Sequence, residues 1–354
     1  MATIGGGLNT TTPYFDPAAS GGLQVEYTRN PASFKLNRYI RIVPLADQLN
    51  GKYLRIDPIQ GTRVTASPQS QLWPFGQDRP KGMPLEFSFQ SFSCERYTES
   101  FNLPMEPTRA ARWDVRATSA RVAAQRLMTG RAQRLATLLQ TTGNYTSGQT
   151  YAATTNLLGS TKTWDSSTAT DKGIQKSIRK IAQNAAKATG GSVQLKDIVM
   201  VMGPGTADRM AASPEIEKYV VNNMRSLDFL TYRGDFDSYG LPPNLFGLGD
   251  VVVDDTVITA TKQNATTTTT SFMWADGYVG FYARPGAMVS QAADTQMADY
   301  AAVSLFAYED MSVEVFDGTE DAQKHRRIDG GVTDTSDIKL TAPAGAFLLV
   351  DCFS

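Results

Sequence analysis

The chain has 354 residues, of which 41% are apolar and 19% charged, and its 34 basic residues nearly balance 35 acidic residues. This composition is typical of a globular protein, and the apolar runs are too short to span a bilayer. Cys94 and Cys352 lie far apart in the sequence and indicate neither a disulfide framework nor a thiolate metal site. The first residues lack the basic and apolar regions of a secretory signal, so none is expected.

The N-terminal quarter predicts an arm followed by a hairpin. Residues 1–36 are rich in Gly, Thr, Asn and Pro and are expected to form an extended arm. Short β-like runs before and after a proline-rich segment predict a long β-hairpin, whose tip carries Trp73, Phe75 and Lys81. Because two strands alone bury too little surface to be stable, we expect the hairpin to lie on another subunit.

Residues 109–140 contain seven arginines, no lysine and one acid, and are predicted to form one long helix. At about 100° per residue, most of the arginines share an arc of roughly 140°. The members of this arc are Arg109, Arg112, Arg116, Arg126, Arg131 and Arg134. Large apolar residues, Trp113 among them, fall inside the same arc, which does not suit a recognition helix presented freely to a DNA groove.

Three interpretations of this arginine face stay open. The arginines pair with carboxylates of other elements or subunits, form a solvated face, or contact nucleic acid directly. Arginine is preferred over lysine where planar, bidentate pairing with carboxylates is needed, which favours the first interpretation.

The middle of the chain predicts an α/β layered region. Residues 141–170 are predicted to be a loop, and 171–189 a helix that buries an isoleucine-bearing face and is capped by Thr170 or Asp171. The apolar run at 198–202 predicts a buried strand, followed by a "GPG" turn into a short helix. This helix, strand and helix succession is typical of layered α/β subdomains.

The last third of the chain is predicted to be mainly β. Between the α/β region and this last third, a further helix is expected to start at Pro214, with Ser213 as its N-cap. Beyond residue 250 the strand patterns continue almost to the last residue, and Asp276 and Gly277 predict the two-residue turn of a hairpin.

No constellation of residues predicts an active site. The single histidine, His325, has no second histidine for a metal site and no Ser or Cys motif beside it. Asp235 and Asp237 form a D-x-D pair, but no glutamate completes a calcium loop. We therefore predict no catalytic residue, no metal site and no cofactor.

The order of segments resembles the major capsid proteins of tailed bacteriophages with the HK97-like fold. The most detailed likeness is in the tail, where "SFMWADGYVGFYARPGA" (271–287) looks like the family's Trp-containing hairpin and following strand. Residues 300–350 look like its closing strands, with a turn of basic and acidic residues before "DIK" and a final G-x-x-L strand. The resemblance implies an α+β fold.

On this resemblance the chain divides into family domains. These are an N-terminal arm (1–36), an extended E-loop hairpin (37–104), a peripheral P-domain with its spine helix (105–170), an axial A-domain (171–270) and closing strands shared by the P- and A-domains (271–354). The arginine face on the spine helix would then contact other subunits or face the lumen. Lys81 lies near the E-loop tip, where some members form a cross-link, but no partner asparagine or acid is identifiable, so no cross-link is expected.

The resemblance implies a structural protein rather than an enzyme. Such a protein self-assembles as hexamers and pentamers into an icosahedral shell around phage double-stranded DNA, in a virion capsid assembled in the host cytoplasm. Implied partners are a separate scaffolding protein, since the chain starts directly with the arm, a portal protein and DNA contacted without sequence specificity. A decoration protein is also compatible, and no membrane is implied. The alternatives are an encapsulin-like compartment and, with less support, an α/β enzyme.

Overall fold

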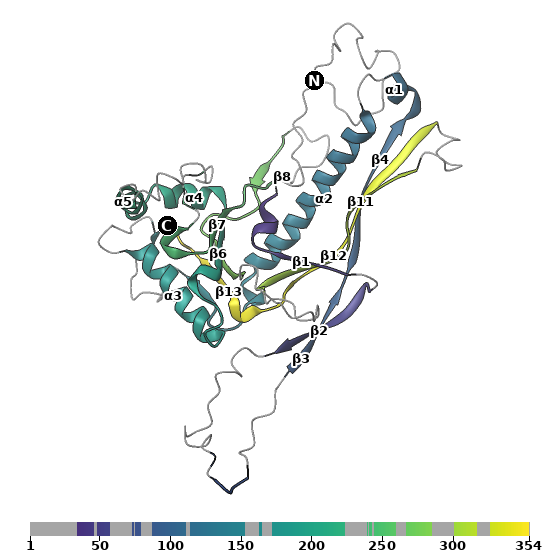
Figure 1. The fold of residues 1–354 in the computed structure, drawn as a ribbon. Helices are drawn as coiled ribbons and strands as arrows, with labels where there is room; N and C mark the ends of the chain where they lie inside the picture. Colours follow the sequence, from purple (N-terminus) through teal and green to yellow (C-terminus); the bar gives the residue numbers. More distant parts are fainter. Residues whose placement is uncertain are drawn as a thin grey trace.

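The computed structural model describes residues 34–45, 48–56, 73, 75–78, 87–110, 114–152, 163–164, 172–223, 239, 241–242, 244–259, 267–284, 301–316 and 326–353. The molecule is elongated (Figure 1). Helix α2 (Val115–Gln140) lies along a four-stranded sheet, a five-stranded sheet forms a lobe with three further helices, and a two-stranded hairpin projects away from both.

The four-stranded sheet has the order β1-β11-β12-β4. Its strands are β1 (Arg41–Pro44), β11 (Val303–Phe316), β12 (Arg327–Leu340) and β4 (Glu95–Pro104). Strand β1 is parallel to β11, whereas β11, β12 and β4 are antiparallel. Helix α2 packs the short side chains of Ala123 and Ala124, with Leu127, against Val332 of β12. Small residues at this contact let the helix approach the sheet closely.

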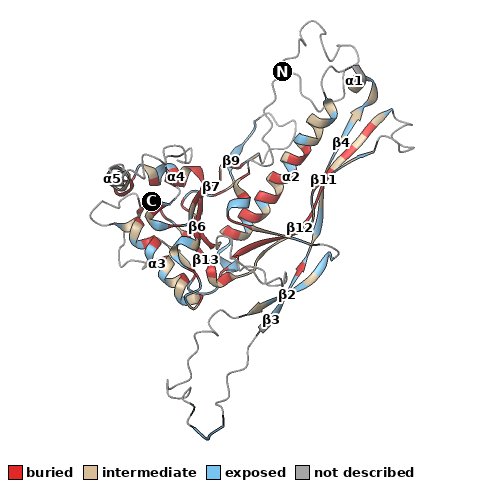
Figure 2. Cartoon of the chain, in the orientation of Figure 1, coloured by how far each residue is buried: buried red, intermediate tan, exposed pale blue. Residues whose placement is uncertain are grey.

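The five-stranded sheet has the order β5-β13-β10-β6-β7. Its strands are β5 (Thr150–Ala152), β13 (Ala346–Val350), β10 (Val279–Ala283), β6 (Ile198–Met202) and β7 (Asp250–Val253). Strands β6 and β10 are buried along their whole length. A single hydrophobic core joins this sheet to Leu135 and Leu139 of α2 and to Leu305 of β11, and buried positions gather where these elements meet (Figure 2).

The remaining described elements are two-stranded ribbons, helices and 3-10 turns. Two antiparallel ribbons are β2 (Asn50–Ile56) with β3 (Phe87–Ser93), and β8 (Val257–Thr259) with β9 (Thr270–Phe272). The other helices are α1 (Met105–Ala110), α3 (Gly173–Ala188), α4 (Pro204–Ala211) and α5 (Pro214–Asn223). Single 3-10 turns are η2 (Lys35–Arg38), η5 (Thr142–Asn144), η7 (Leu195–Asp197), η8 (Leu245–Gly247) and η9 (Pro343–Gly345).

The helices and strand predicted in the middle of the chain are confirmed. Helix α3 buries Ile174, Ile178 and Ile181, as the 3.6-residue periodicity predicts. It is followed by Gly190 with φ of 60°, the left-handed conformation that glycine adopts at low cost. Strand β6 precedes α4 and α5. Helix α5 begins at Pro214, so Ser213 occupies the predicted N-cap position, and its carbonyl accepts from the N–H of Glu217 at 3.0 Å. The buried hydroxyl of Ser213, however, makes no capping hydrogen bond.

The start of α3 is capped from another helix. The residue at its N-cap position is Lys172 rather than Thr170 or Asp171, which lie outside the described residues, so that prediction is wrong. A lysine side chain cannot accept a hydrogen bond. Instead the buried carboxylate of Glu215 in α5 accepts from two N–H groups in the first turn of α3, at 3.0 and 2.9 Å. An acid at this end also complements the helix dipole.

Replacing Glu215 by glutamine should lower the free energy of unfolding by about 1 kcal/mol, because the amide keeps one acceptor oxygen and loses the charge. Chemical denaturation measures the change. Glu217→Gln, exposed on the same helix, is the matched control and should change the free energy by less than about 0.5 kcal/mol. Equal effects of the two substitutions would contradict the capping role.

Two predictions about connecting segments are wrong. Residues 141–170, predicted to be a loop, contain η5 and the strand β5, which pairs in parallel with β13. Strand β10 pairs with β6 and β13 rather than with β9, so Asp276 and Gly277 form a turn but no hairpin. Strand β5 is short and its partner is distant in sequence, so no local pattern indicates it.

Candidate assembly surfaces

The predicted arginine face is divided between two helices. Helix α1 ends at Ala110 and α2 begins at Val115, so the prediction of one continuous helix over 109–140 is wrong. Asp114 is the N-cap of α2, and its Oδ1 accepts a hydrogen bond from the N–H of Ala117 at 3.0 Å. The one acid among the arginines therefore marks the start of the helix.

The structure places four of the six predicted arginine side chains. Arg112 and the side chain of Arg109 lie outside the described residues. Arg116 is exposed near the start of α2. The others each contact a carboxylate on the four-stranded sheet, and they are Arg126, Arg131 and Arg134.

Arg131 is buried against the sheet, with a side chain only 3% exposed, and does not lie on an open face. Its guanidinium makes a bidentate contact with Asp334 of β12, with Nε to Oδ2 at 3.1 Å and Nη2 to Oδ1 at 2.6 Å. Asp334 is fully buried and also accepts from Arg134 Nη2 at 2.9 Å. No sequence motif points to Asp334, whose one local signal is that it is an acid within a strand.

A bulge in β11 supplies the second carboxylate. The pairing of β11 with β12 shifts register between Ala307 and Ser312, and Met311 inside this irregularity has φ of 53°. The neighbouring Asp310 accepts from Arg131 Nη2 at 2.8 Å. A bulge changes the direction of a side chain on a strand, so the irregular strand lets Asp310 reach α2.

The charges in this cluster are well compensated. Burial alone would lower the pKa of Arg131, but the hydrogen bonds and charges of Asp334 and Asp310 outweigh it and raise the pKa. Arg134 also lies 3.4 Å above the centre of the Tyr97 ring, a cation–π contact. Removing either partner of such a buried pair is costly, because the other charge stays buried.

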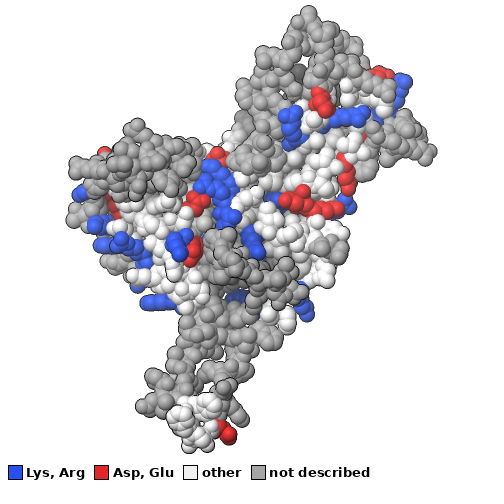
Figure 3. Space-filling view, viewed as in Figure 1, with Lys and Arg blue, Asp and Glu red and all other residues white. Residues whose placement is uncertain are grey.

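Ion pairs nearer the surface follow the same pattern. Arg126 Nη1 is 2.9 Å from Glu99 Oε1 of β4, and both side chains are at least one third exposed. On the face of the molecule drawn in Figure 3, basic side chains (blue) and acidic side chains (red) are interspersed and do not form one continuous basic patch. The paired arginines of α2 therefore connect a helix to a sheet.

The inner face of the β2–β3 hairpin packs on its own chain. Phe92 of β3 stacks on Phe306 of β11, with ring centres 4.6 Å apart, and Tyr53 of β2 stacks on the same ring at 5.5 Å. Gly51, opposite Phe92, has no side chain, which leaves room for the Phe92 ring. These contacts fix the base of the hairpin to the four-stranded sheet.

The outer face of the same hairpin is apolar and exposed. Leu54 and Phe89 are direct cross-strand partners, and they are 52% and 62% exposed. Trp73 and Phe75, predicted at the tip, are also exposed, whereas Lys81 lies outside the described residues. Leu54 and Phe89, two large apolar side chains that lie side by side on an exposed face, indicate an association site.

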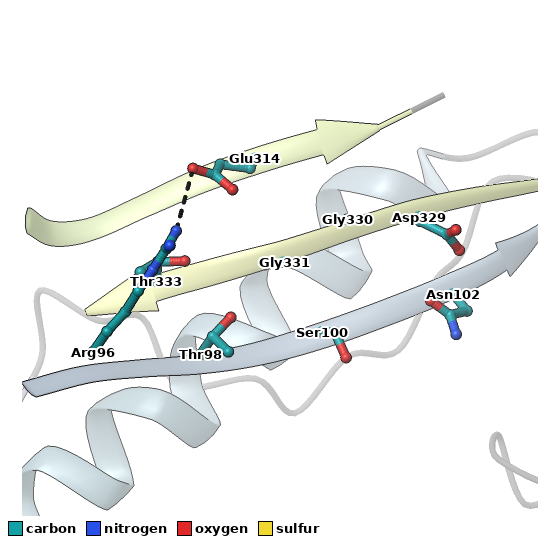
Figure 4. Close-up of a pocket in the computed structure, with 9 residues that line it drawn as sticks. All are labelled: Arg96, Thr98, Ser100, Asn102, Glu314, Asp329, Gly330, Gly331 and Thr333. Carbon is teal, nitrogen blue, oxygen red and sulfur yellow. Dashed lines mark ion pairs between the residues drawn. The ribbon is translucent and has the colours of Figure 1, made fainter. Parts of the chain in front are cut away.

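The face of the four-stranded sheet opposite α2 forms a polar groove (Figure 4). Its lining residues are Arg96, Thr98, Ser100, Asn102, Glu314, Asp329, Gly330, Gly331 and Thr333. Gly331 presents no side chain to the groove, and Arg96 reaches across to Glu314, with nitrogen and oxygen 3.8 Å apart. Among the described residues that line the groove, the polar groups are hydroxyls, an amide, carboxylates and one guanidinium, which suits contact with another polar surface.

Three tyrosines are buried where the two sheets meet. Tyr39 donates to Asp254 Oδ2 at 3.0 Å, and Tyr145 donates to the carbonyl of Leu139 at 2.6 Å and shares a hydrogen bond with Tyr282 at 2.9 Å. Burial is the largest cause that raises the pKa of each hydroxyl, and the charge of Asp254 adds to it at Tyr39.

We expect the protein to lose stability as the pH rises above about 10, the ordinary tyrosine pKa. The unfolded chain releases these protons near that pH, whereas the folded chain holds them to higher pH. The free energy of unfolding should fall by up to about 1.4 kcal/mol per pH unit for each buried tyrosine. Urea unfolding at pH 8, 10 and 11 measures the slope, and Tyr145→Phe should make it shallower. An unchanged slope would contradict the assignment.

The arrangement of helices and strands matches that of known structures. No protein-family model and no curated protein matches the chain. A phage-related protein from Bordetella bronchiseptica matches with a TM-score of 0.59 and 14% identity, over 91% of this chain and 93% of that chain. The capsid of cyanophage P-SCSP1u matches at 0.54 and 12%, over 95% and 92%. The mature capsid of bacteriophage PhiM1 matches at 0.54 and 11%, over 93% and 90%.

The chain has the fold of phage capsid proteins. This confirms the α+β capsid fold that the sequence resemblance predicts. In this capsid fold α2 is fixed to the four-stranded sheet, and the apolar hairpin extends from the same sheet (Figure 1). Within the described part of the chain, no helix combines the length and hydropathy needed to cross a bilayer.

Proposed function

We propose that the chain is the major capsid protein of a bacteriophage, which self-assembles as hexamers and pentamers into an icosahedral shell around double-stranded DNA. The observation that supports this function most strongly is the capsid fold, which extends over more than nine tenths of the chain. Its location would be the virion capsid, after assembly in the host cytoplasm.

On this proposal, each part of the chain corresponds to a domain of the capsid family. Residues 1–36 would be the arm, 37–104 the E-loop with β2 and β3, 105–170 the P-domain with α2, and 171–270 the A-domain with α3 to α5. Residues 271–354 would close both domains. In support, β11 and β12 belong to the four-stranded sheet, whereas β10 and β13 belong to the five-stranded sheet.

The exposed hairpin gives a physical reason for assembly. Its inner face is held by Phe306, and its outer face presents Leu54 and Phe89 to solvent in the single chain. Burying such side chains contributes about 1.5 to 3 kcal/mol each. A neighbouring copy that covers this face would supply that free energy at every contact of the shell, where a stable interface buries roughly 1,000 Å² or more.

Negative-stain electron microscopy of the purified protein tests the proposal. Shells, or hexameric rings that close into shells when a scaffolding protein is added, are the expected result. A uniform monomer at high protein concentration, with and without scaffold, would overturn it. Nuclease-protected double-stranded DNA inside native particles supports a phage capsid, whereas an enclosed cargo protein would identify an encapsulin-like compartment.

Further partners follow from the same function. A separate scaffolding protein, a portal protein and, on the outer surface, a decoration protein would contact the shell. The packaged DNA would be contacted without sequence specificity, by charge alone.

Replacing Arg116 by alanine should lower the yield of shells more than the amount of DNA each shell retains. Arg126, Arg131 and Arg134 of α2 pair with carboxylates, and we expect Arg116 to serve assembly through the same chemistry. Particle counts by microscopy and the ratio of DNA to protein per particle measure the two effects. Normal shells with little DNA would assign Arg116 to genome contact instead.

A further inference from the structure

Arg38 and Tyr39 connect the two sheets directly. They lie at the end of η2, immediately before β1 on the edge of the four-stranded sheet. Both side chains reach β7, the edge strand of the five-stranded sheet. Arg38 makes a bidentate contact with Asp250 at the start of β7, with Nε to Oδ2 at 3.0 Å and Nη2 to Oδ1 at 2.6 Å. Tyr39 donates to Asp254, immediately after β7.

Asp254, the acceptor directly after β7, is itself held in place by other hydrogen bonds. Asp254 is 1% exposed, and its Oδ1 accepts from both the N–H and the hydroxyl of Thr256, at 3.1 and 2.6 Å. Its Oδ2 is then directed at the hydroxyl of Tyr39. Both oxygens therefore have donors, and the donor to Oδ2 is the hydroxyl of Tyr39, which follows η2.

A second connection joins α2 to the five-stranded sheet. Tyr145 follows α2 and η5, donates to Leu139 in the last turn of α2, and shares a hydrogen bond with Tyr282 of β10. The rings of Tyr282 and Tyr39 also stack, with centres 6.4 Å apart. The side-chain amide of Gln140 adds two hydrogen bonds of 3.1 Å each. Its Nε2 donates to the carbonyl of Met273, and its Oε1 accepts from the N–H of Ala275.

Stability alone does not account for so many polar groups inside an apolar core. Burying a hydroxyl or a carboxylate costs free energy that its hydrogen bonds only partly recover, and apolar residues of similar shape are often as stable. Apolar packing, however, is non-directional and tolerates sliding between layers. Hydrogen bonds and bidentate ion pairs are directional, so a seam built from them admits one relative orientation.

We propose that Arg38 and Tyr39, together with Tyr145, form a clamp that fixes the angle between the four-stranded and five-stranded sheets. The clamp holds the edge of one sheet to the edge of the other and ties the end of α2 to the centre of the second sheet. On the proposed capsid function, this angle sets how each subunit meets its neighbours and hence the curvature of the shell.

Distance measurements test the clamp, with one spin label on the four-stranded sheet and one on helix α3, which contacts β13 of the five-stranded sheet. Labels at Ser100→Cys on β4 and Lys187→Cys on α3, both exposed, are introduced into a Cys94→Ser chain and diluted with unlabelled protein. In the Tyr39→Phe, Tyr145→Phe double variant, the distance distribution should widen by about twofold, because the sheets sample more than one orientation. Arg38→Gln, which leaves the core intact, should widen it to a smaller extent.

Tyr151→Phe is the matched control. It removes the hydroxyl that accepts a hydrogen bond from Asn184 at 2.7 Å, a contact between β5 and α3 on the five-stranded side alone. It should leave the distribution as narrow as in the parent chain. A narrow distribution in the folded double variant and in Arg38→Gln would overturn the clamp, as would equal widening in the control. This result does not depend on shell formation, so it is separate from the test of the capsid function.

Discussion

Replacing Leu54 and Phe89 together by aspartate should leave the chain folded and abolish shell formation. Both side chains are more than half exposed in the single chain, so charged groups there meet water and cost little. In an interface the same charges would be buried without partners. Centrally placed apolar anchors typically contribute about 2 kcal/mol or more each, and an icosahedral shell repeats their loss at every subunit. Microscopy and sedimentation measure assembly, and circular dichroism measures folding.

Gln90→Asp is the matched control for this pair. Gln90 is exposed and adjacent to Phe89 on β3, but its side chain points to the opposite face of the hairpin. It adds one negative charge to β3, at the position next to Phe89, and should leave shells intact. Normal shells from the Leu54→Asp, Phe89→Asp variant would show that this face is not an interface. Loss of shells from both variants would indicate a general effect of charge on the hairpin.

Replacing Asp334 by asparagine should lower the free energy of unfolding by about 3 kcal/mol. The carboxylate is fully buried and binds two guanidinium groups, Arg131 by two hydrogen bonds and Arg134 by one. The amide removes the negative charge and leaves Arg131 buried with only the half-exposed Asp310 as its partner. Chemical denaturation monitored by circular dichroism measures the loss.

Two further variants distinguish the effect of burying the charges from the effect of pairing them. Arg126→Met breaks the exposed pair with Glu99 on the same helix and should cost less than about 1 kcal/mol. Arg131→Met combined with Asp334→Leu removes both buried charges and should recover part of the stability that Asp334→Asn loses. A small effect of Asp334→Asn, comparable to that of Arg126→Met, would contradict the role given to the buried cluster.

Local patterns in the sequence predict the elements well. The isoleucine spacing predicts α3, the run at 198–202 predicts β6, and the alternation near Phe89 predicts the β2–β3 hairpin. Each of these signals lies within a few turns or strand positions of the element it describes. Asp114 is a local signal as well, and its preference for the N-cap position would have located the start of α2.

The contacts that the sequence does not predict join side chains that are distant along the chain. The arginine spacing indicates carboxylate pairing, but Asp334 and Asp310 lie far along the chain on β12 and β11. Glu215 caps α3 from another helix, and Tyr39 reaches Asp254 across two sheets. No periodicity within one segment reports such contacts, because they depend on how the sheets are placed.

The order of strands has a consequence for how quickly the chain reaches this structure. The five-stranded sheet pairs Thr150 with Leu348, and the four-stranded sheet pairs Arg41 with Ser304. Sheets closed by such non-local pairs fold slowly, since loop-closure entropy must be overcome before the contacts form. Until those pairs form, apolar surface that the folded chain covers is open to contact with other chains. We therefore expect soluble yield to rise when synthesis is slowed, because unfinished chains then meet one another less often.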